Sequence, residues 1–184
     1  MRCVRCTLGI LVWCFALFSN PTTARAWTQA EATAFVQEAG FAGTDIVYRE
    51  GGPTLALTWP TLHLMLVDLP VGVTPGEAKY ILLHELAHVV QYREGRLAVD
   101  HTDPDAVRPL EWEADVWAVT EGCKYGLTLA DAERLWARRL QQGYTGDPFH
   151  GVLMERLAYL REKAPTCALP PTERRLKEGE ICRG

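Results

Sequence analysis

The sequence predicts an α+β fold in which a small antiparallel sheet packs on a central helix and a helical C-terminal half follows. β-rich runs separated by Gly and Pro lie between residues 44 and 69. An apolar helical pattern with an N-terminal capping signal follows at residues 74–95, and only helical patterns come after it. Because 48% of the 184 residues are hydrophobic, the chain can form one compact domain with a core.

The first 26 residues are expected to be an export signal rather than part of that domain, which then covers residues 27–165. Arg2 and Arg5 give a positive start, residues 7–18 form an apolar run, and small residues precede Trp27. The run is shorter than the roughly 20 residues that a spanning helix needs, which favours cleavage over a membrane anchor. We therefore expect a secreted or periplasmic protein without stable membrane insertion after cleavage near Ala26.

The charge of the chain argues against a nucleic-acid partner. Removing residues 1–26 removes three of the 19 basic residues and none of the 23 acidic ones, which leaves a formal charge of −7. Nucleic-acid binding requires a basic face. The oligomeric state is left open by the sequence.

Three cysteines follow the expected signal, and they would be in a compartment where disulfides persist. Cys167 and Cys182 flank a Pro-rich, charged segment within the tail at residues 166–184. A bridge between them would tether this tail and contribute roughly 3 kcal/mol through loop entropy. Cys123 could equally pair with either, and the odd number leaves one thiol free or intermolecular.

The elements of the domain are expected in a simple order. A Thr cap and a Gly stop define a first helix over residues 28–40. Two or three antiparallel strands follow, in the runs 44–50, 54–59 and 61–69. Thr74, Pro75 and Glu77 then form a strong helix start, so the central helix should run from Pro75 to about Glu94 and end at Gly95. A polar loop should lead to a second helix after Pro109, and two further helical patterns cover residues 128–143 and 148–164.

Two histidines and a glutamate interrupt the apolar pattern of the central helix. His84 and His88 are one turn apart, so both imidazoles can offer a nitrogen at about 2.0–2.1 Å to one zinc ion. Glu85 between them can reach a water on that ion, as in the HExxH motif. The alternative is a pair of core histidines satisfied by hydrogen bonds. Zn²⁺ binding also requires a third protein ligand, which this alternative does not predict.

The third ligand is expected on the following helix. A ligand close by, as in metzincins, is excluded because Gln91 and Glu94 occupy the positions where Gly and His would stand. In the gluzincin type the ligand is a glutamate on a following helix, with an aspartate one turn further on. Glu111, 23 residues after His88, and Asp115 supply that pair.

Glu113 competes with Glu111 for this role, but Trp117 rather than an acid lies one turn beyond it. We favour Glu111 for that reason. Asp115 would accept a hydrogen bond from the non-ligating nitrogen of His84, which fixes the tautomer of that ring. The alternative role of Asp115 is a place on a solvated helix face.

The HExxH segment from His84 to His88 and the ExxAD segment from Glu111 to Asp115 resemble those of small bacterial gluzincin metallopeptidases, and "HELAHVVQ" is similar to the helix of minimal gluzincin domains. The resemblance implies that zinc is held by the two histidines and Glu111. It also implies that Glu85 is the general base in the hydrolysis of a peptide bond.

The resemblance covers about residues 74–122 and the preceding strand, and in gluzincins that strand binds substrate at the sheet edge. It also implies a downstream residue that stabilises the oxyanion. The candidates are His150, Tyr144 and Arg156, of which His150 is favoured because it follows a Gly/Asp/Pro turn at a helix start. A surface role for His150 is equally open.

The other two histidines, His63 in the third strand run and His101 in an acidic loop, are expected to be solvated. The sequence thus predicts a zinc metallopeptidase that acts on a peptide or protein substrate. The alternative is a non-catalytic zinc-binding or interaction module of an envelope or secretion system. Glu85 favours the enzyme, because a structural zinc site has no use for a base beside an open position.

Overall fold

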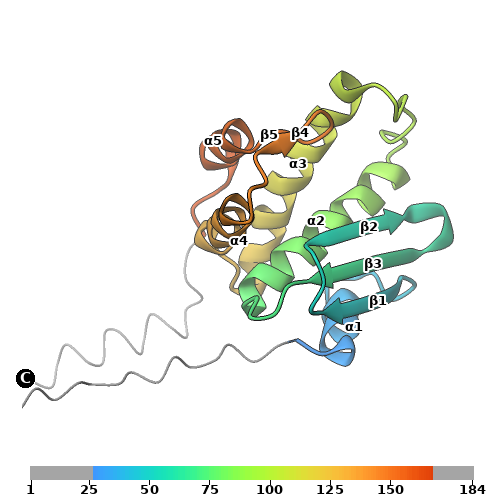
Figure 1. The fold of residues 1–184 in the computed structure, drawn as a ribbon. Helices are drawn as coiled ribbons and strands as arrows, with labels where there is room; N and C mark the ends of the chain where they lie inside the picture. Colours follow the sequence, from blue (N-terminus) through green and yellow to red (C-terminus); the bar gives the residue numbers. More distant parts are fainter. Residues whose placement is uncertain (1–26, 168–184) are drawn as a thin grey trace, which may run out of the picture.

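The computed structural model describes residues 27–167 and has an α+β fold, which confirms the predicted class (Figure 1). The expected signal at residues 1–26 and most of the tail lie outside the described residues. Between residues 27 and 167, no helix is long and apolar enough to cross a membrane. The helices are α1 (Gln29–Glu38), α2 (Pro75–Arg93), α3 (Pro104–Gly122), α4 (Leu129–Gln141) and α5 (Leu153–Lys163), with short 3₁₀ turns η1 (Pro60–Leu62) and η2 (Cys123–Tyr125). The strands are β1 (Asp45–Glu50), β2 (Leu55–Trp59), β3 (Leu64–Leu69), β4 (Gly146–Asp147) and β5 (Gly151–Val152).

The main sheet is mixed, so the expectation of an all-antiparallel sheet was wrong in this detail. Its order is β1-β3-β2, with β3 parallel to β1 and antiparallel to β2. Alternate side chains of β3 are fully buried, namely Met65, Val67 and Leu69. The most apolar strand therefore takes the central position, where it is paired on both sides. As a consequence β2, rather than the strand immediately before α2, forms the sheet edge beside α2.

The opposite edge of the sheet is covered by a side chain from α1. The amide of Gln29 donates to the carbonyl oxygen of Ile46 at 2.8 Å and accepts from the backbone N–H of Tyr48 at 2.7 Å. Both groups belong to β1, so these bonds use the backbone positions that another strand would need. No described strand pairs with the outer edge of β2.

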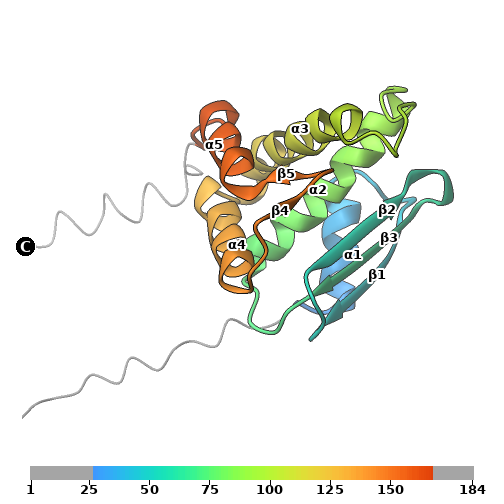
Figure 2. The same ribbon diagram turned by 45° about the horizontal axis from the view of Figure 1, so that its top comes forward.

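Helix α2 lies between the main sheet and the helices α3, α4 and α5 (Figures 1 and 2). Thr74 accepts a hydrogen bond from the backbone N–H of Glu77, and the Glu77 side chain accepts one from the backbone N–H of Thr74. This capping box and Pro75 fix the start of the helix where the sequence predicts it. Most residues of α2 are buried, including His84 and Glu85.

Helix α3 begins five residues before Pro109, so the expected loop up to Pro109 was wrong. Asp103 caps the helix by accepting a hydrogen bond from the backbone N–H of Asp105, and Pro104 occupies the first helical position. Pro109 lies inside the helix but is exposed. Water can therefore satisfy the carbonyl group that loses its helical partner, and the helix continues through the proline.

His63 is exposed, as expected, but it does not lie in a strand. It follows η1 with a left-handed backbone at φ 50°, and β3 begins only at Leu64. The η1 turn, which ends at His63, reverses the chain direction between β2 and β3.

A disulfide joins Cys123 to Cys167, with the two Cα atoms 5.3 Å apart. The sequence left open whether Cys123 pairs with Cys167 or with Cys182, and in the structure it pairs with Cys167. It links the end of α3 to the segment after α5. Cys182, and with it any bridge to Cys167 that would tether the tail, lies outside the described residues.

Candidate metal centre

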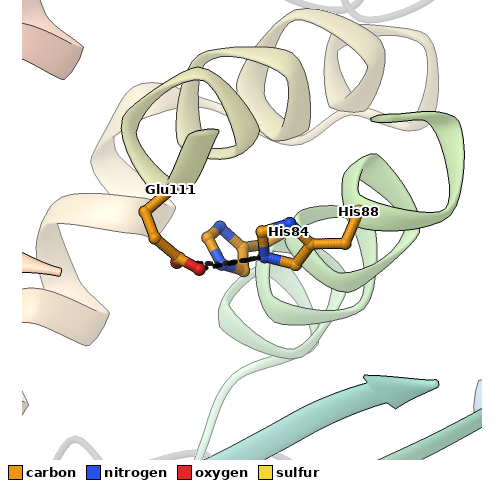
Figure 3. Close-up of side chains that lie close together, drawn as sticks. All are labelled: His84, His88 and Glu111. Carbon is orange, nitrogen blue, oxygen red and sulfur yellow. Dashed lines mark hydrogen bonds and ion pairs between the residues drawn. The ribbon is translucent and has the colours of Figure 1, made fainter. Parts of the chain in front are cut away.

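Three side chains from α2 and α3 point toward one another (Figure 3). His84 and His88 project from α2, and Glu111 reaches them from α3. One ligand atom of each lies within 4.8 Å of the others. The spacing of four along α2 and the return of α3 against it bring together the residues that the sequence proposes as metal ligands.

The distances within this cluster are near those between the ligands of one tetrahedral zinc ion, with the two histidines facing different oxygens of Glu111. Nε2 of His84 lies 3.3 Å from Nε2 of His88 and 3.3 Å from Oε2 of Glu111. Nε2 of His88 lies 3.5 Å from Oε1 of Glu111. Ligand atoms at about 2.0–2.1 Å from zinc in tetrahedral geometry are separated by about 3.3–3.4 Å. The residues present therefore fit the group that the sequence implies.

A buried oxygen without a hydrogen-bond partner lies in the same cluster. Oε2 of Glu111 makes no hydrogen bond with any described residue, although nitrogens of His84, His150 and Arg156 lie 3.3 to 3.7 Å away. A buried carboxylate oxygen without a well-directed hydrogen bond is only partly compensated by such neighbours. A cation bound at this point would give it a closer partner.

Asp115 holds His84 from the side opposite to the cluster. Oδ1 of Asp115 lies 2.9 Å from Nδ1 of His84, which leaves Nε2 facing Glu111. Asp115 is fully buried and is also bound by Arg156, through Nε and through a second nitrogen at 2.9 Å, and by the hydroxyl of Tyr80 at 2.6 Å. Burial raises the pKa of Asp115, but the charge of Arg156 and the contacts with His84 lower it to about 2. Asp115 is therefore an ionised partner for the imidazole.

Gln91 holds the ring of His88 as Asp115 holds that of His84. Sequence reasoning missed this role of Gln91. The amide nitrogen of Gln91 donates to the carbonyl oxygen of Leu110 at 2.8 Å, so its amide oxygen is the atom 2.8 Å from Nδ1 of His88. Nδ1 must then carry the proton of the neutral ring, and Nε2 presents its lone pair to the cluster. The position of Gln91 on the same helical stripe as His88 was a signal in the sequence. The carbonyl oxygen that fixes the Gln91 amide belongs to α3, however, and that contact could not be inferred.

The electrostatics of the cluster favour a positive charge at its centre. Burial would lower the pKa of His84, but contacts with Asp115 and Glu111 and their negative charges raise it to about 10. Burial would raise the pKa of Glu111, but His84, His88 and His150 hold it well below its ordinary value. The site therefore stabilises a cation at Nε2 of His84, whether a proton or a metal ion supplies the charge.

Glu85 is buried beside the cluster and does not take part in it. Its Oε2 accepts a hydrogen bond from the hydroxyl of Thr58 at 2.7 Å. Thr58 belongs to the edge strand β2, so the carboxylate lies between the metal-binding residues and the sheet edge. Thr58 could not be identified from sequence, because this contact depends on how α2 packs on the sheet.

His150 approaches the cluster from the hairpin formed by β4 and β5. Its Nε2 lies 3.5 Å from Oε2 of Glu111, and its Nδ1 lies 2.7 Å from Oδ2 of Asp147. The hydroxyl of Tyr144 donates to the same oxygen of Asp147 at 2.6 Å. The indole N–H of Trp112 donates to the carbonyl oxygen of His150 at 2.9 Å and ties the hairpin to α3.

The remaining candidates lie apart from the cluster or serve it indirectly. Glu113 is exposed and forms an ion pair with Arg96. His101 is exposed, and its Nε2 contacts the carbonyl oxygen of Leu97 at 3.0 Å. Arg156, one of the oxyanion candidates, is buried and bound to Asp115.

Comparison of the chain with protein-family models, with curated proteins and with solved structures finds no match. The resemblance to gluzincins therefore rests on the two sequence motifs alone.

Proposed function

We propose that this protein is a secreted or periplasmic zinc metallopeptidase of the gluzincin type. The observation that supports the proposal best is that one ligand atom from each of His84, His88 and Glu111 lies within 4.8 Å of the other two, with the two Nε2 atoms 3.3 Å apart. A buried carboxylate, Glu85, lies next to this set and is not used by it. A purely structural site has no need of such a base.

Each residue has a role that follows from its position. A bound zinc ion would supply Lewis acidity, polarising the scissile carbonyl group and lowering the pKa of a water molecule. Glu85 takes a proton from that water and delivers it to the leaving amine. Thr58 donates to one oxygen of Glu85 and leaves the other for the proton. His150 is oriented by Asp147 at Nδ1, and in its imidazolium form it can also donate from Nε2 to the developing oxyanion.

The edge of β2 is the expected binding surface for the peptide. It is next to Glu85 through Thr58, and no described strand pairs with it. An extended peptide could add to this edge through backbone hydrogen bonds. The other edge of the sheet is less suited, because Gln29 already bonds to its backbone.

Metal analysis combined with the Glu85→Gln variant tests the proposal. We expect about one zinc ion per chain in both proteins, and a 10²- to 10⁴-fold loss of peptide cleavage in the variant. Activity that survives in Glu85→Gln would contradict the mechanism. Zinc binding without any cleavage by the unmodified protein would support the zinc-binding module instead.

A matched pair of variants tests the third ligand. Glu111→Gln should lose zinc, whereas Glu113→Gln, which makes the same change two residues away on an exposed side chain, should retain it. Zinc content measured after dialysis gives the answer. Equal losses in the two variants would contradict the assignment of Glu111.

A further inference from the structure

A small pocket lies directly beside the metal-binding cluster. It has a volume of about 50 Å³ and opens between the edge of the sheet and helices α2 and α4. By the same measure a single water needs about 10–15 Å³, so the pocket has room for a group of a few heavy atoms. Its lining includes Thr54, Ala56, His84, Glu85, Arg139 and His150.

Arg139 is a cation without an anionic partner in this pocket. It is half-buried on α4, and its guanidinium stacks on the rings of Tyr144 at 3.8 Å and Trp136 at 5.7 Å. Its guanidinium makes no hydrogen bond or ion pair with any residue between 27 and 167. Its neighbours along the helix differ, because Arg134 is paired with Asp131 and Arg138 with Glu77.

The other charged groups around the pocket are already bound. Arg156 is neutralised by Asp115, and Glu85 accepts from Thr58. Asp147, on the nearby hairpin, accepts from Tyr144 and contacts His150. The stacking on two rings holds the guanidinium of Arg139 in place without using its five N–H donors.

One further donor of the pocket lacks a partner. Thr54 Oγ1 is buried and makes no hydrogen bond within the described part of the chain, and Thr54 lines the pocket. A buried donor without an acceptor is costly. A carboxylate offers only acceptor positions, about four of them, and is small enough for this volume.

We infer that Arg139 binds a carboxylate of the substrate, so that the site prefers peptides with an acidic side chain or a free C-terminal carboxylate beside the scissile bond. This inference rests on the proposed peptidase function and narrows its substrate class. The formal net charge of −4, or −7 after the expected removal of residues 1–26, disfavours acidic substrates at long range, so the preference is a local property of this pocket.

Paired peptides test the inference. Each peptide of a mixed set is prepared with Glu and with Gln at the positions around the cleaved bond, and with a free and an amidated C-terminus. We expect kcat/KM to be about 10- to 100-fold higher for the member that carries the carboxylate, which is the range for a hydrogen-bonded charged group. The Glu/Gln pairs and the C-terminal pairs identify which carboxylate is bound.

Arg139→Met should abolish this preference while cleavage of the neutral peptides is retained, because Met preserves contact with the two rings. Arg139→Gln is a second variant in case the first does not fold. Arg134→Met removes the same charge from an exposed position on the same helix and should keep the preference.

Equilibrium binding of the same peptides to Glu85→Gln separates this inference from the proposed function. Selective binding that is lost in Glu85→Gln/Arg139→Met would support the carboxylate pocket even if no peptide were cleaved, a result that would contradict the peptidase function alone. Cleavage without a preference would contradict the inference alone. Equal kcat/KM and equal binding affinity of the paired peptides would overturn the inference about Arg139.

Discussion

Glu111 is approached from two regions of the molecule that hold their histidines in different ways. The side chain of His84, on the buried helix α2, is 9% exposed, whereas that of His150, on the β4–β5 hairpin, is 40% exposed. His84 is held through Asp115, which is itself bound by Arg156. His150 is held by Asp147 and by one hydrogen bond from Trp112.

This difference indicates that the two regions contribute to different properties of the site. The ligands on α2 and α3 are fixed by buried partners, as a metal site requires if it is to favour one geometry. The hairpin consists of two-residue strands, and we expect that it can be altered without disturbing the proposed metal ligands. Metal binding and turnover should therefore respond separately to substitutions in the two regions.

The largest effect is expected from Arg156→Met. The substitution leaves the fully buried Asp115 without its cationic partner, so the free energy of unfolding should fall by about 3–5 kcal/mol. Urea denaturation measures the loss. The matched control is Arg161→Met, which removes an exposed arginine of the same helix and should cost about 0–1 kcal/mol. Similar losses in both variants would mean that the buried pair does not support the α2–α3 region.

Gln91→Leu should weaken zinc binding with less effect on stability. Without the amide oxygen, Nδ1 of His88 loses the acceptor that fixes its tautomer. Loss of such a partner typically lowers metal affinity 10- to 100-fold. Competition with a chelating dye measures the affinity, and the exposed Gln142→Leu serves as control. Unchanged zinc affinity in Gln91→Leu would show that Gln91 does not orient the ligand.

The hairpin can be disturbed alone by a glycine substitution. A Cβ at Gly146 would lie 2.2 Å from the carbonyl oxygen of Gly151 on the opposing strand, whereas one at Gly143 meets nothing within 4 Å. Both glycines have positive φ, so Gly146→Ala and Gly143→Ala share that cost and differ in the clash. We expect Gly146→Ala to be less stable than Gly143→Ala by about 1–2 kcal/mol.

The same pair of variants tests whether the two regions are separable. Gly146→Ala should lower kcat through displacement of His150, and zinc affinity should stay unchanged. Zinc titration and peptide cleavage measured on one preparation give both values. A parallel loss of zinc affinity would contradict the independence of the hairpin and the metal cluster.

The parts of the fold that could be predicted from sequence are those with local signals. The capping box at Thr74 and the proline after it define the start of α2, because both act within one turn. The place of β3 between β1 and β2 could not be predicted, since strand pairing depends on which strand is most deeply buried in the finished core. The true start of α3 did have a local signal, in Asp103 and Pro104. Pro109 masked it, because an exposed proline can be tolerated inside a helix.

The residues of the candidate site also divide into those with a local sequence signal and those brought together only by tertiary packing. His84, His88 and the pair Glu111 and Asp115 follow helical spacings of four, so their alignment can be inferred from sequence. Thr58 and Arg139 reach the site from β2 and α4, and their contacts exist only after tertiary packing.

The smallest expected effect concerns the acid dependence of the hairpin. Burial would raise the pKa of Asp147, but the hydroxyl of Tyr144 and the contacts with His150 lower it to about 2 from an ordinary value of 3.8. Because the folded pKa is the lower one, this carboxylate stabilises the fold above about pH 3.8, and the contribution disappears as the pH falls toward 2. Its side chain is 34% exposed, so Asp147→Asn should cost less than about 1 kcal/mol at pH 6. The difference from the unmodified protein, measured by urea denaturation, should shrink at pH 3. A difference that grows at pH 3 would mean that Asp147 is protonated in the folded hairpin, and that another group orients His150.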